Sequence, residues 1–190
     1  RNHLAFHGVD LTLSVDAEEQ TTVAVATIDS SGVASYSFYT KDTADWGWTA
    51  GELPSAEQLA ALDTKAIQYG CLGMAIGPGN LVIEAWLKNF FEAGTVTLSH
   101  DLNISPALGF ERELELERVL RLNAQSHIIK ASDADIEWLY GLDVGADLDD
   151  IASEWSKGKL VVITRGAEGV SLYRDGKRID VAGQRVNLVD

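Results

Sequence analysis

The 190-residue sequence is poor in cysteine, in basic residues and in long apolar runs. Its single cysteine, Cys71, excludes an internal disulfide and is typical of a reducing compartment, so we expect a cytoplasmic protein. Its 15 Lys and Arg against 29 Asp and Glu give a net charge of −14, which argues against nucleic acids and anionic membranes as partners. No apolar run approaches the roughly 20 residues of a membrane-spanning helix, and none near Arg1 resembles a signal peptide.

Motifs of several common enzyme and metal-binding classes are absent as well. The four histidines show no ligand spacing and there is no Cys/His cluster, which excludes a zinc site of the usual kind. The sequence has no Gly-x-Gly-x-x-Gly fingerprint, no P-loop and no Gly-x-Ser-x-Gly nucleophile. Cys71 lies between Tyr69-Gly70 and Leu72, and this apolar setting favours packing over a catalytic thiol. Because the chain begins with Arg1 and not with Met, we expect its natural start to lie upstream.

The order of strand-like and helix-like segments predicts one α/β domain over residues 1–190. Apolar, β-branched runs recur roughly every thirty residues, and amphipathic stretches separate them, which indicates βαβ units and a mostly parallel sheet. The predicted strands are Lys65–Gly70, Thr95–His100, His127–Ala131 and Leu160–Thr164. The predicted helices are Leu81–Ala93, Glu111–Asn123, Ser132–Tyr140 and Leu148–Trp155.

An earlier segment predicts a β-hairpin that does not belong to this alternation. Two short β-type runs, Thr22–Ile28 and Val33–Tyr39, flank a turn signal at Asp29-Ser-Ser-Gly32. Strand alternation places Tyr36 and Phe38 on one face of this hairpin and Tyr39 on the other.

In open parallel sheets, ligands bind beyond the carboxyl ends of the strands, so the four loops that follow the predicted strands are the candidate sites. The glycines after Gly70 suit a ligand or a tight strand-to-helix turn equally well. The next loops offer Asp101 with Asn103, and then Ser132 with Asp135, a pair that also reads as a helix cap. The last is Thr164-Arg165-Gly166-Ala-Glu-Gly169, whose small residues let a backbone reach an anion.

Taken in this order, the hairpin and the four loops resemble the ribokinase-like (PfkB-type) carbohydrate kinases, and the fructokinases among them. The resemblance covers the central portion of that family, with both family termini missing. It implies a three-layer α/β/α fold with a mostly parallel sheet and a protruding β-lid at residues 12–45. It also implies transfer of the γ-phosphoryl group of ATP to a sugar hydroxyl, with Mg²⁺ and a monovalent cation such as K⁺ as cofactors.

The resemblance assigns expected roles to individual residues. The substrate-binding residues it implies are Tyr36, Phe38, Tyr39, Ala44, Asp101 and Asn103. The nucleotide-binding residues it implies are Ser132, Asp135, Thr164, Gly166 and Gly169. Asp135 and Asp190 are the implied metal ligands, because an oxygen-only site suits Mg²⁺.

Five residues depart from the family pattern. Ser132 and Asp135 stand where the family carries Asn and Glu, which are chemically related. Leu102 and Ser105 stand where the family usually carries Pro and Arg, and Thr40 stands where acid-sugar kinases carry Arg. Two guanidinium groups that would hold a substrate carboxylate are therefore missing. A neutral sugar such as fructose is the expected substrate.

The family's catalytic base belongs to an Asp-Thr-x-Gly-Ala-Gly-Asp motif whose first residue matches Asp190. We therefore expect the base beyond Asp190, no catalytic residue within this chain, and no activity from these 190 residues alone. A nucleoside kinase of the same fold and an inactive, kinase-derived sugar-binding or regulatory protein remain open alternatives. The lid aromatics would suit a sugar ring or a second lid equally, so a homodimer through the lid is a further expectation.

Overall fold

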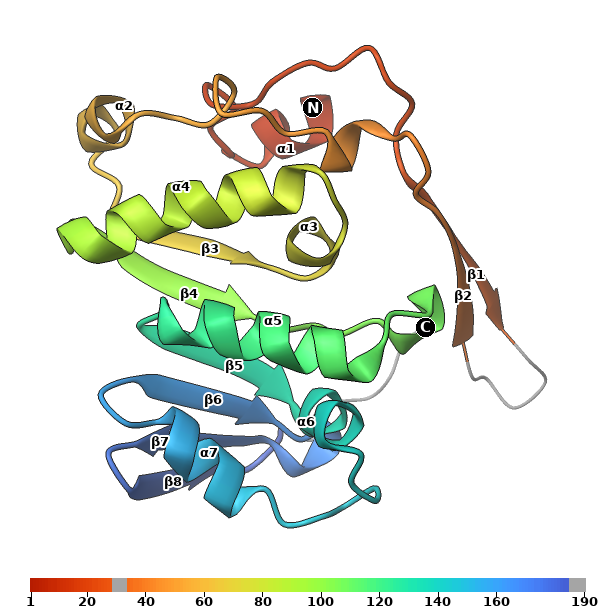
Figure 1. Cartoon of the computed structure of the whole chain (residues 1–190), viewed down its shortest axis with the longest axis vertical. Coiled ribbons are helices and arrows are strands. Elements are labelled where there is room, and N and C mark those ends of the chain that lie inside the picture. The colour runs from red at the N-terminus through yellow and green to blue at the C-terminus, as the bar shows by residue number, and fades with distance from the viewer. Residues whose placement is uncertain (29–33, 185–190) are drawn as a thin grey trace.

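The computed structural model describes residues 1–28 and 34–184, which form two separate β-sheets (Figure 1). The hairpin strands are β1 (Val23–Ile28) and β2 (Ala34–Tyr39). The strands of the large sheet are β3 (Ala66–Gly70), β4 (Thr97–Asp101), β5 (Ile128–Ser132), β6 (Leu160–Thr164), β7 (Val170–Arg174) and β8 (Lys177–Val181). The helices are α1 (Asn2–Phe6), α2 (Ala56–Ala61), α3 (Leu72–Ala75), α4 (Gly79–Ala93), α5 (Arg112–Ala124), α6 (Asp133–Tyr140) and α7 (Asp149–Trp155). Short 3-10 turns are η1 (Ala44–Trp46), η2 (Pro106–Leu108) and η3 (Gly166–Glu168).

The six strands of the large sheet stand in their order along the chain, from β3 to β8. The pairs β3–β4, β4–β5 and β5–β6 are parallel, as expected where a helix connects successive strands. The last two pairs are antiparallel. A tight turn joins β7 to β8, because Asp175 and Gly176 both have positive φ, at 49° and 75°. The predicted mostly parallel sheet is confirmed.

Helices α4 to α7 lie along one face of this sheet (Figure 1). Burial alternates along β4, β5 and β6, so every second side chain points into the helix layer. Two apolar clusters fill that layer, one under α5 to α7 and one under α4. Leu98, Ile129 and Val161 are completely buried there, and each such side chain contributes roughly 1.5–3 kcal/mol through the hydrophobic effect.

The hairpin β1–β2 projects away from the large sheet (Figure 1). Its strands are antiparallel with Val23 opposite Tyr39, and every residue of β1 is exposed. A two-stranded sheet is marginal by itself, so the hairpin depends on its attachment at the base. There Gln20 bridges to Thr43, and the hydroxyls of Thr22 and Thr43 lie 2.7 Å apart. The predicted strands are confirmed, while the predicted turn at Asp29–Gly32 lies outside the described residues.

The predicted element boundaries are confirmed closely where side-chain patterns define them. The strand Leu160–Thr164 is observed with the same bounds. The strand predicted at Thr95–His100 begins two residues later in the structure, at Thr97, because α4 ends at Ala93 and Gly94 turns the chain with φ 62°. Helix α2 begins with a capping box formed by Ser55 and Gln58.

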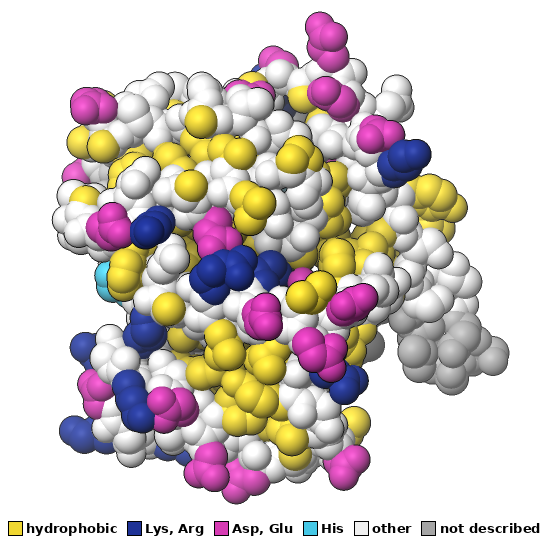
Figure 2. Space-filling model, in the orientation of Figure 1, with side chains coloured by type: hydrophobic (Ala, Val, Ile, Leu, Met, Phe, Trp, Pro, Cys, Tyr) yellow, Lys and Arg dark blue, Asp and Glu magenta, His cyan; other side chains and the backbone are white. Residues whose placement is uncertain are grey.

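The helix side of the molecule carries apolar as well as charged surface. Figure 2 shows apolar side chains over α4 and again between α5 and α7, with acidic side chains scattered around them. Leu81, Leu114 and Leu120 are among the exposed apolar residues of α4 and α5. Within residues 1–28 and 34–184, no helix combines the length and apolar character that crossing a membrane would require.

Candidate functional site

The carboxyl ends of β3, β4, β5 and β6 lie side by side along one edge of the sheet. The strand register places Gly70 beside Asp101, Asp101 beside Lys130, and Ser132 beside Thr164. All four predicted loop sites therefore begin along this edge. The parallel pairing of the strands is the physical reason, because it aligns all carboxyl ends in one direction.

The loops after β3 and β4 are in direct contact. A Cβ atom on Gly70 would lie 1.8 Å from the carbonyl oxygen of Asp101, so only glycine fits there. The next residue, Cys71, donates its backbone N–H to the same oxygen at 3.1 Å and has φ 53°. The amide Nδ2 of Asn103 donates to the Cys71 Sγ at 3.1 Å. Cys71 is half-buried, so its thiol is partly accessible to solvent and lies in contact with the Asn103 amide.

Asp101 does not stand alone at the end of β4. Its Oδ1 lies 3.0 Å from the Nζ of Lys130, on the neighbouring strand β5. Both side chains are about one-third exposed or less, at 27% and 33%, so the pair is only partly screened by water. Lys130 was not among the predicted site residues, although its alternating position in a predicted strand could have placed it beside Asp101.

A completely buried histidine precedes Asp101. The His100 ring stacks on Tyr69 with ring centres 5.2 Å apart, and its Nδ1 lies 2.8 Å from Asn123 Oδ1. Burial lowers the pKa of His100 to about 4, because the charged ring would lose its hydration. His100 is therefore a neutral part of the layer that supports this loop.

Ser132 and Asp135 form the start of α6, as the capping pattern predicts. The Ser132 hydroxyl accepts the backbone N–H of Asp135 at 3.1 Å, and Asp135 Oδ2 accepts the N–H of Ser132 at 2.7 Å. This is a capping box. The second carboxylate oxygen of Asp135 accepts the N–H of Ile104, from the loop after β4, at 2.8 Å. No local sequence pattern predicts this last contact, which joins two candidate loops.

The loop after β6 is shaped by glycines. The backbone N–H of Arg165 donates to the Gly169 carbonyl at 2.8 Å and closes the loop. Gly169 has φ 104°, and a Cβ there would lie 2.0 Å from the carbonyl of Val181. Gly166, by contrast, has φ 50° and open space where a Cβ would stand. At Gly169 the loop is thus packed against the backbone at the end of β8. At Gly166 it is open, and a ligand can approach the backbone there.

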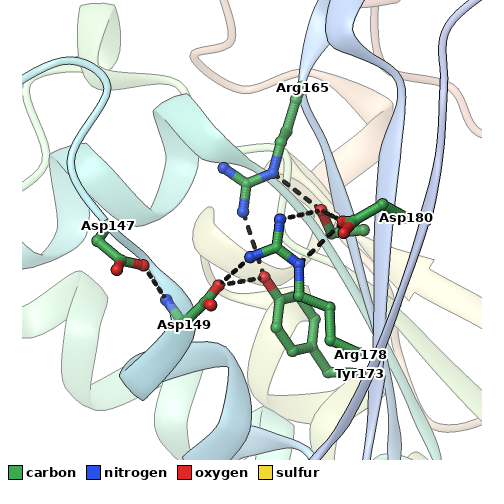
Figure 3. Close-up of polar contacts among 7 residues, drawn as sticks. Asp147, Asp149, Arg165, Tyr173, Arg178 and Asp180 are labelled. Carbon is green, nitrogen blue, oxygen red and sulfur yellow. Dashed lines mark hydrogen bonds and ion pairs between the residues drawn. The ribbon is translucent and has the colours of Figure 1, made fainter.

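The side chain of Arg165 belongs to a polar network on β7, β8 and the start of α7 (Figure 3). Its Nε donates to Ser171 Oγ at 3.0 Å and its Nη2 to the Tyr173 hydroxyl at 3.3 Å. Arg178 in turn donates to Asp149 at 2.6 Å and to Asp180 at 2.9 Å. Within this network, the positive charges of Arg165 and Arg178 balance the negative charges of Asp149 and Asp180.

Hydrogen bonds within this network shift the pKa values of its carboxyl groups and of its tyrosine. The Tyr173 hydroxyl donates to Asp149 Oδ1 at 2.7 Å and, with Arg178, keeps the pKa of that carboxyl below its usual value. The Ser171 hydroxyl and Arg178 lower the pKa of Asp180 in the same way. Burial, followed by the bond to Asp149, raises the pKa of Tyr173. The network therefore keeps its charges near neutral pH and holds Arg165 to β7.

The predicted lid residues lie on β2 and in the segment that follows it. Tyr36 and Tyr39 are exposed, and the rings of Tyr36 and Phe38 stack with centres 6.1 Å apart. The alternation predicted for this strand is confirmed by its register. β2 also contacts η2, in the loop that continues from Asn103, so the hairpin approaches the Asp101–Asn103 loop.

A hollow lies between the base of the hairpin and the segment before α4. It has a volume of about 480 Å³, and Thr40, Thr43, Trp46, Gly77 and Pro78 are among its lining residues. Ala44, a predicted substrate residue, lies in η1 at this base and donates its N–H to Gln20 at 2.9 Å. A larger hollow of about 560 Å³ beyond Ala44 is lined by several carboxylates, so its lining suits a phosphate poorly.

The structure thus brings the residues predicted around Asp101, Ser132 and Thr164 to one edge, and places the hairpin residues beside the same loop region. Asp190, a predicted metal ligand, lies outside the described residues. No cluster of three or more His, Cys, Asp or Glu that could hold a metal ion is found in residues 1–28 and 34–184.

Comparison with known proteins agrees with this arrangement. The family model described as pfkB family carbohydrate kinase matches residues 1–190. The chain belongs to this family. A fructokinase from Rhizobium leguminosarum bv. trifolii is 35% identical over 161 residues, which are 84% of this chain and 47% of that relative. Fructokinase-1 of Oryza sativa subsp. japonica is 29% identical over 177 residues, covering 92% of this chain and 53% of the relative. The chain spans about half the length of the curated relatives it matches.

Solved structures of fructokinases share the fold. A fructokinase from Xylella fastidiosa with bound ATP has a TM-score of 0.82 at 21% identity, over 100% of this chain and 57% of that one. A fructokinase double mutant from Vibrio cholerae O395, in a form with fructose, ADP and potassium ion bound, has a TM-score of 0.78 at 21% identity, over 100% and 59%. The ribokinase-like fold predicted from the sequence is confirmed.

Proposed function

We propose that this chain forms the substrate-holding part of an ATP-dependent kinase for a neutral sugar such as fructose. The observation that carries the proposal is the row of loops at the carboxyl ends of β3 to β6, with the hairpin standing beside them. Curated relatives named fructokinase support the same reading.

The sugar is proposed to lie between the hairpin and the loop that holds Asp101 and Asn103. Tyr36 and Phe38, on one face of the hairpin, offer ring faces to the apolar side of a sugar, while a carboxylate and an amide suit its hydroxyls. Thr40, which lines the hollow at the hairpin base, carries no charge, and the positive charge of Lys41 in the same lining is offset by Glu19 and Asp42. This chemistry favours a neutral sugar over a sugar acid.

The nucleotide is proposed to lie along Ser132 and the loop from Thr164 to Gly169. Open space at Gly166 gives its phosphates access to the backbone. The oxygen donors of Ser132 and Asp135 fit Mg²⁺ through water, since both Asp135 oxygens already accept backbone N–H groups. Bound Mg²⁺ would neutralise charge on the phosphates. A monovalent cation such as K⁺ near Asp190 remains part of the proposal.

Phosphoryl transfer requires a base that takes the proton of the sugar hydroxyl as its oxygen attacks the γ-phosphorus. Asp101 is paired with Lys130, and both oxygens of Asp135 are occupied, so neither carboxylate is suited to this role. We therefore propose that the base lies outside the described residues and that the 190 residues alone do not turn over. The chain's part is to hold the two substrates and exclude water.

The two faces of the hairpin suggest two uses. The register puts Tyr36 and Phe38 on one face, and Val23, Val25 and Tyr39 on the other. Val23, Val25 and Tyr39 are each more than 40% exposed. We propose that the first face covers the sugar and that the second pairs with the hairpin of another copy. Sedimentation equilibrium of the protein and of Val25→Lys tests the pairing, and an unchanged mass in the variant would contradict it.

A coupled assay for ADP release tests the proposed function. The longest native form of the protein is mixed with Mg-ATP and either fructose, 2-keto-3-deoxygluconate or adenosine. Fructose-dependent ADP formation is the expected result. Activity only with adenosine would replace the proposal by a nucleoside kinase, and fructose binding without ADP formation would replace it by a sugar-binding protein.

A further inference from the structure

The carboxylate of Asp135 joins two segments that are far apart in the sequence. Asp135 as a whole is only 6% exposed to solvent. Oδ1 accepts the N–H of Ile104 at 2.8 Å and Oδ2 accepts the N–H of Ser132 at 2.7 Å. Hydrogen bonds from N–H groups to a buried carboxylate are charge-assisted and are stronger than neutral ones. The loop after β4 is therefore fastened to the start of α6 by one side chain.

The charges around Asp135 indicate that this fastening is its main interaction. No Lys or Arg in the described segments forms an ion pair with it, and the nearest pair at this edge, Lys130 with Asp101, is complete in itself. Backbone donors at the N-terminal end of α6 balance the charge instead. A carboxylate whose two oxygens each accept one backbone N–H group has little freedom to turn toward direct contact with a metal ion.

Asn103 stands between the residues that this bond holds down. Leu102, before it, is buried to 1% exposure, and Ile104, after it, packs against the core of the helix layer. Asn103 itself is exposed, has φ 41°, and points its amide to Cys71 Sγ at 3.1 Å. The direction of the Asn103 side chain is therefore set by the backbone that Asp135 holds.

We propose that Asp135 is a positioning residue that fixes Asn103 relative to the start of α6, and so sets sugar affinity. This role differs from direct metal or phosphate contact. The statement about sugar rests on the proposed function, whereas the statement about the position of Asn103 rests on the contacts alone. The two parts are tested separately.

The first test uses Cys71, the single thiol of the chain, as a reporter. Asp135→Asn keeps the volume but leaves one acceptor oxygen for two N–H groups, so the loop should loosen. We expect the reaction of Cys71 with Ellman's reagent to accelerate at least about fivefold, as exposure of a thiol governs its rate. Asn103→Gly, which removes the contact directly, should give a similar increase.

Asp133→Asn is the matched control. It removes a carboxylate from the same first turn of α6, but Asp133 bonds only to the N–H of Ala134, at 2.8 Å. The thiol rate should stay at the wild-type value. Equal rates for Asp135→Asn and wild type, with both folded by circular dichroism, would overturn the proposal. Asp135→Asn is the deciding variant, because Asp135→Ala would also remove buried volume and could fail to fold.

The second test uses turnover. In the longest native form, Asp135→Asn should raise the KM for the sugar at least about tenfold, because small displacements of a substrate contact are costly. The KM for ATP should change several-fold less than the KM for the sugar, because Asp135 reaches Mg²⁺ only through water. Recovery of the rate by excess Mg²⁺ would instead assign Asp135 to the metal. Absence of turnover in every form would contradict the proposed function and leave the thiol result standing.

Discussion

The loops after β4 and after β6 begin at the same edge of the sheet, but different interactions hold them in place. A buried carboxylate, Asp135, fastens the first through two backbone N–H groups. Close packing of Gly169 against the carbonyl of Val181 holds the second, and Arg165 ties it to β7. The first loop is thus sensitive to charge and the second to added volume.

This difference matches what each loop is proposed to hold. A sugar needs polar side chains in fixed directions, and a hydrogen-bonded carboxylate fixes the direction of Asn103. Phosphates need exposed backbone, which glycines provide without a side chain in the way. Four changes can break or sharpen the comparison.

The largest effect is expected from Gly169→Ala. The new Cβ would lie 2.0 Å from the Val181 carbonyl, and φ 104° is strained for alanine. We expect a loss of at least about 3 kcal/mol in the free energy of unfolding, measured by urea denaturation. Gly166→Ala is the control, with φ 50° and open space, and should cost only about 1 kcal/mol. Similar losses for the two would show that packing does not hold this loop.

The second effect is a dependence of the free energy of unfolding on pH, which arises from His100 on β4. The pKa of folded His100 is about 4 and its reference value is 6.5, so the unfolded chain binds a proton that the folded chain rejects. Stability is therefore complete above about pH 6.5 and falls as the pH drops toward 4. We expect a loss of about 2 kcal/mol between pH 7.5 and pH 5.

Urea titrations at both pH values, on wild type and His100→Gln, measure this effect. The variant should lose most of the pH dependence, whereas His3→Gln, at an exposed position, should retain it. A pH dependence that survives in His100→Gln would assign it to other groups.

The third effect concerns the network in Figure 3. Arg165→Ala removes contacts to Ser171 and Tyr173, but these keep their bonds to Asp180 and Asp149. The cost should therefore stay near about 1 kcal/mol, because no buried hydroxyl loses its last partner. We expect a raised KM for ATP with an unchanged KM for the sugar. A raised KM for the sugar alone would contradict the division between the loops.

The smallest effect is expected from Arg178→Ala. Arg178 bridges Asp149 and Asp180 at the exposed rim of the same network, with 39% of its side chain exposed. Exposed ion pairs contribute less than about 1 kcal/mol and weaken in salt. Thermal denaturation at low and high salt measures it. A large loss that persists in high salt would mean that the network is more deeply coupled than its exposure indicates.

Local patterns in the sequence predicted the strands, the helices and the cap at Ser132, because they depend on residues close together. They could not predict the bond from Ile104 to Asp135, which joins positions 31 residues apart. Local patterns also could not predict the partner of Arg121 on another helix. Arg121 bonds to Glu84 of α4 at 2.5 Å, since the packing of two helices offers a nearer carboxylate.

The most direct test of the central claim compares Asn103→Gly with Gly166→Asn in the longest native form of the protein. Both replacements suit a positive φ, so the fold should survive. Asn103→Gly should raise the KM for fructose and leave the KM for ATP unchanged, and Gly166→Asn should do the reverse. The same shift in both constants for both variants would contradict a sugar loop after β4 and a nucleotide loop after β6.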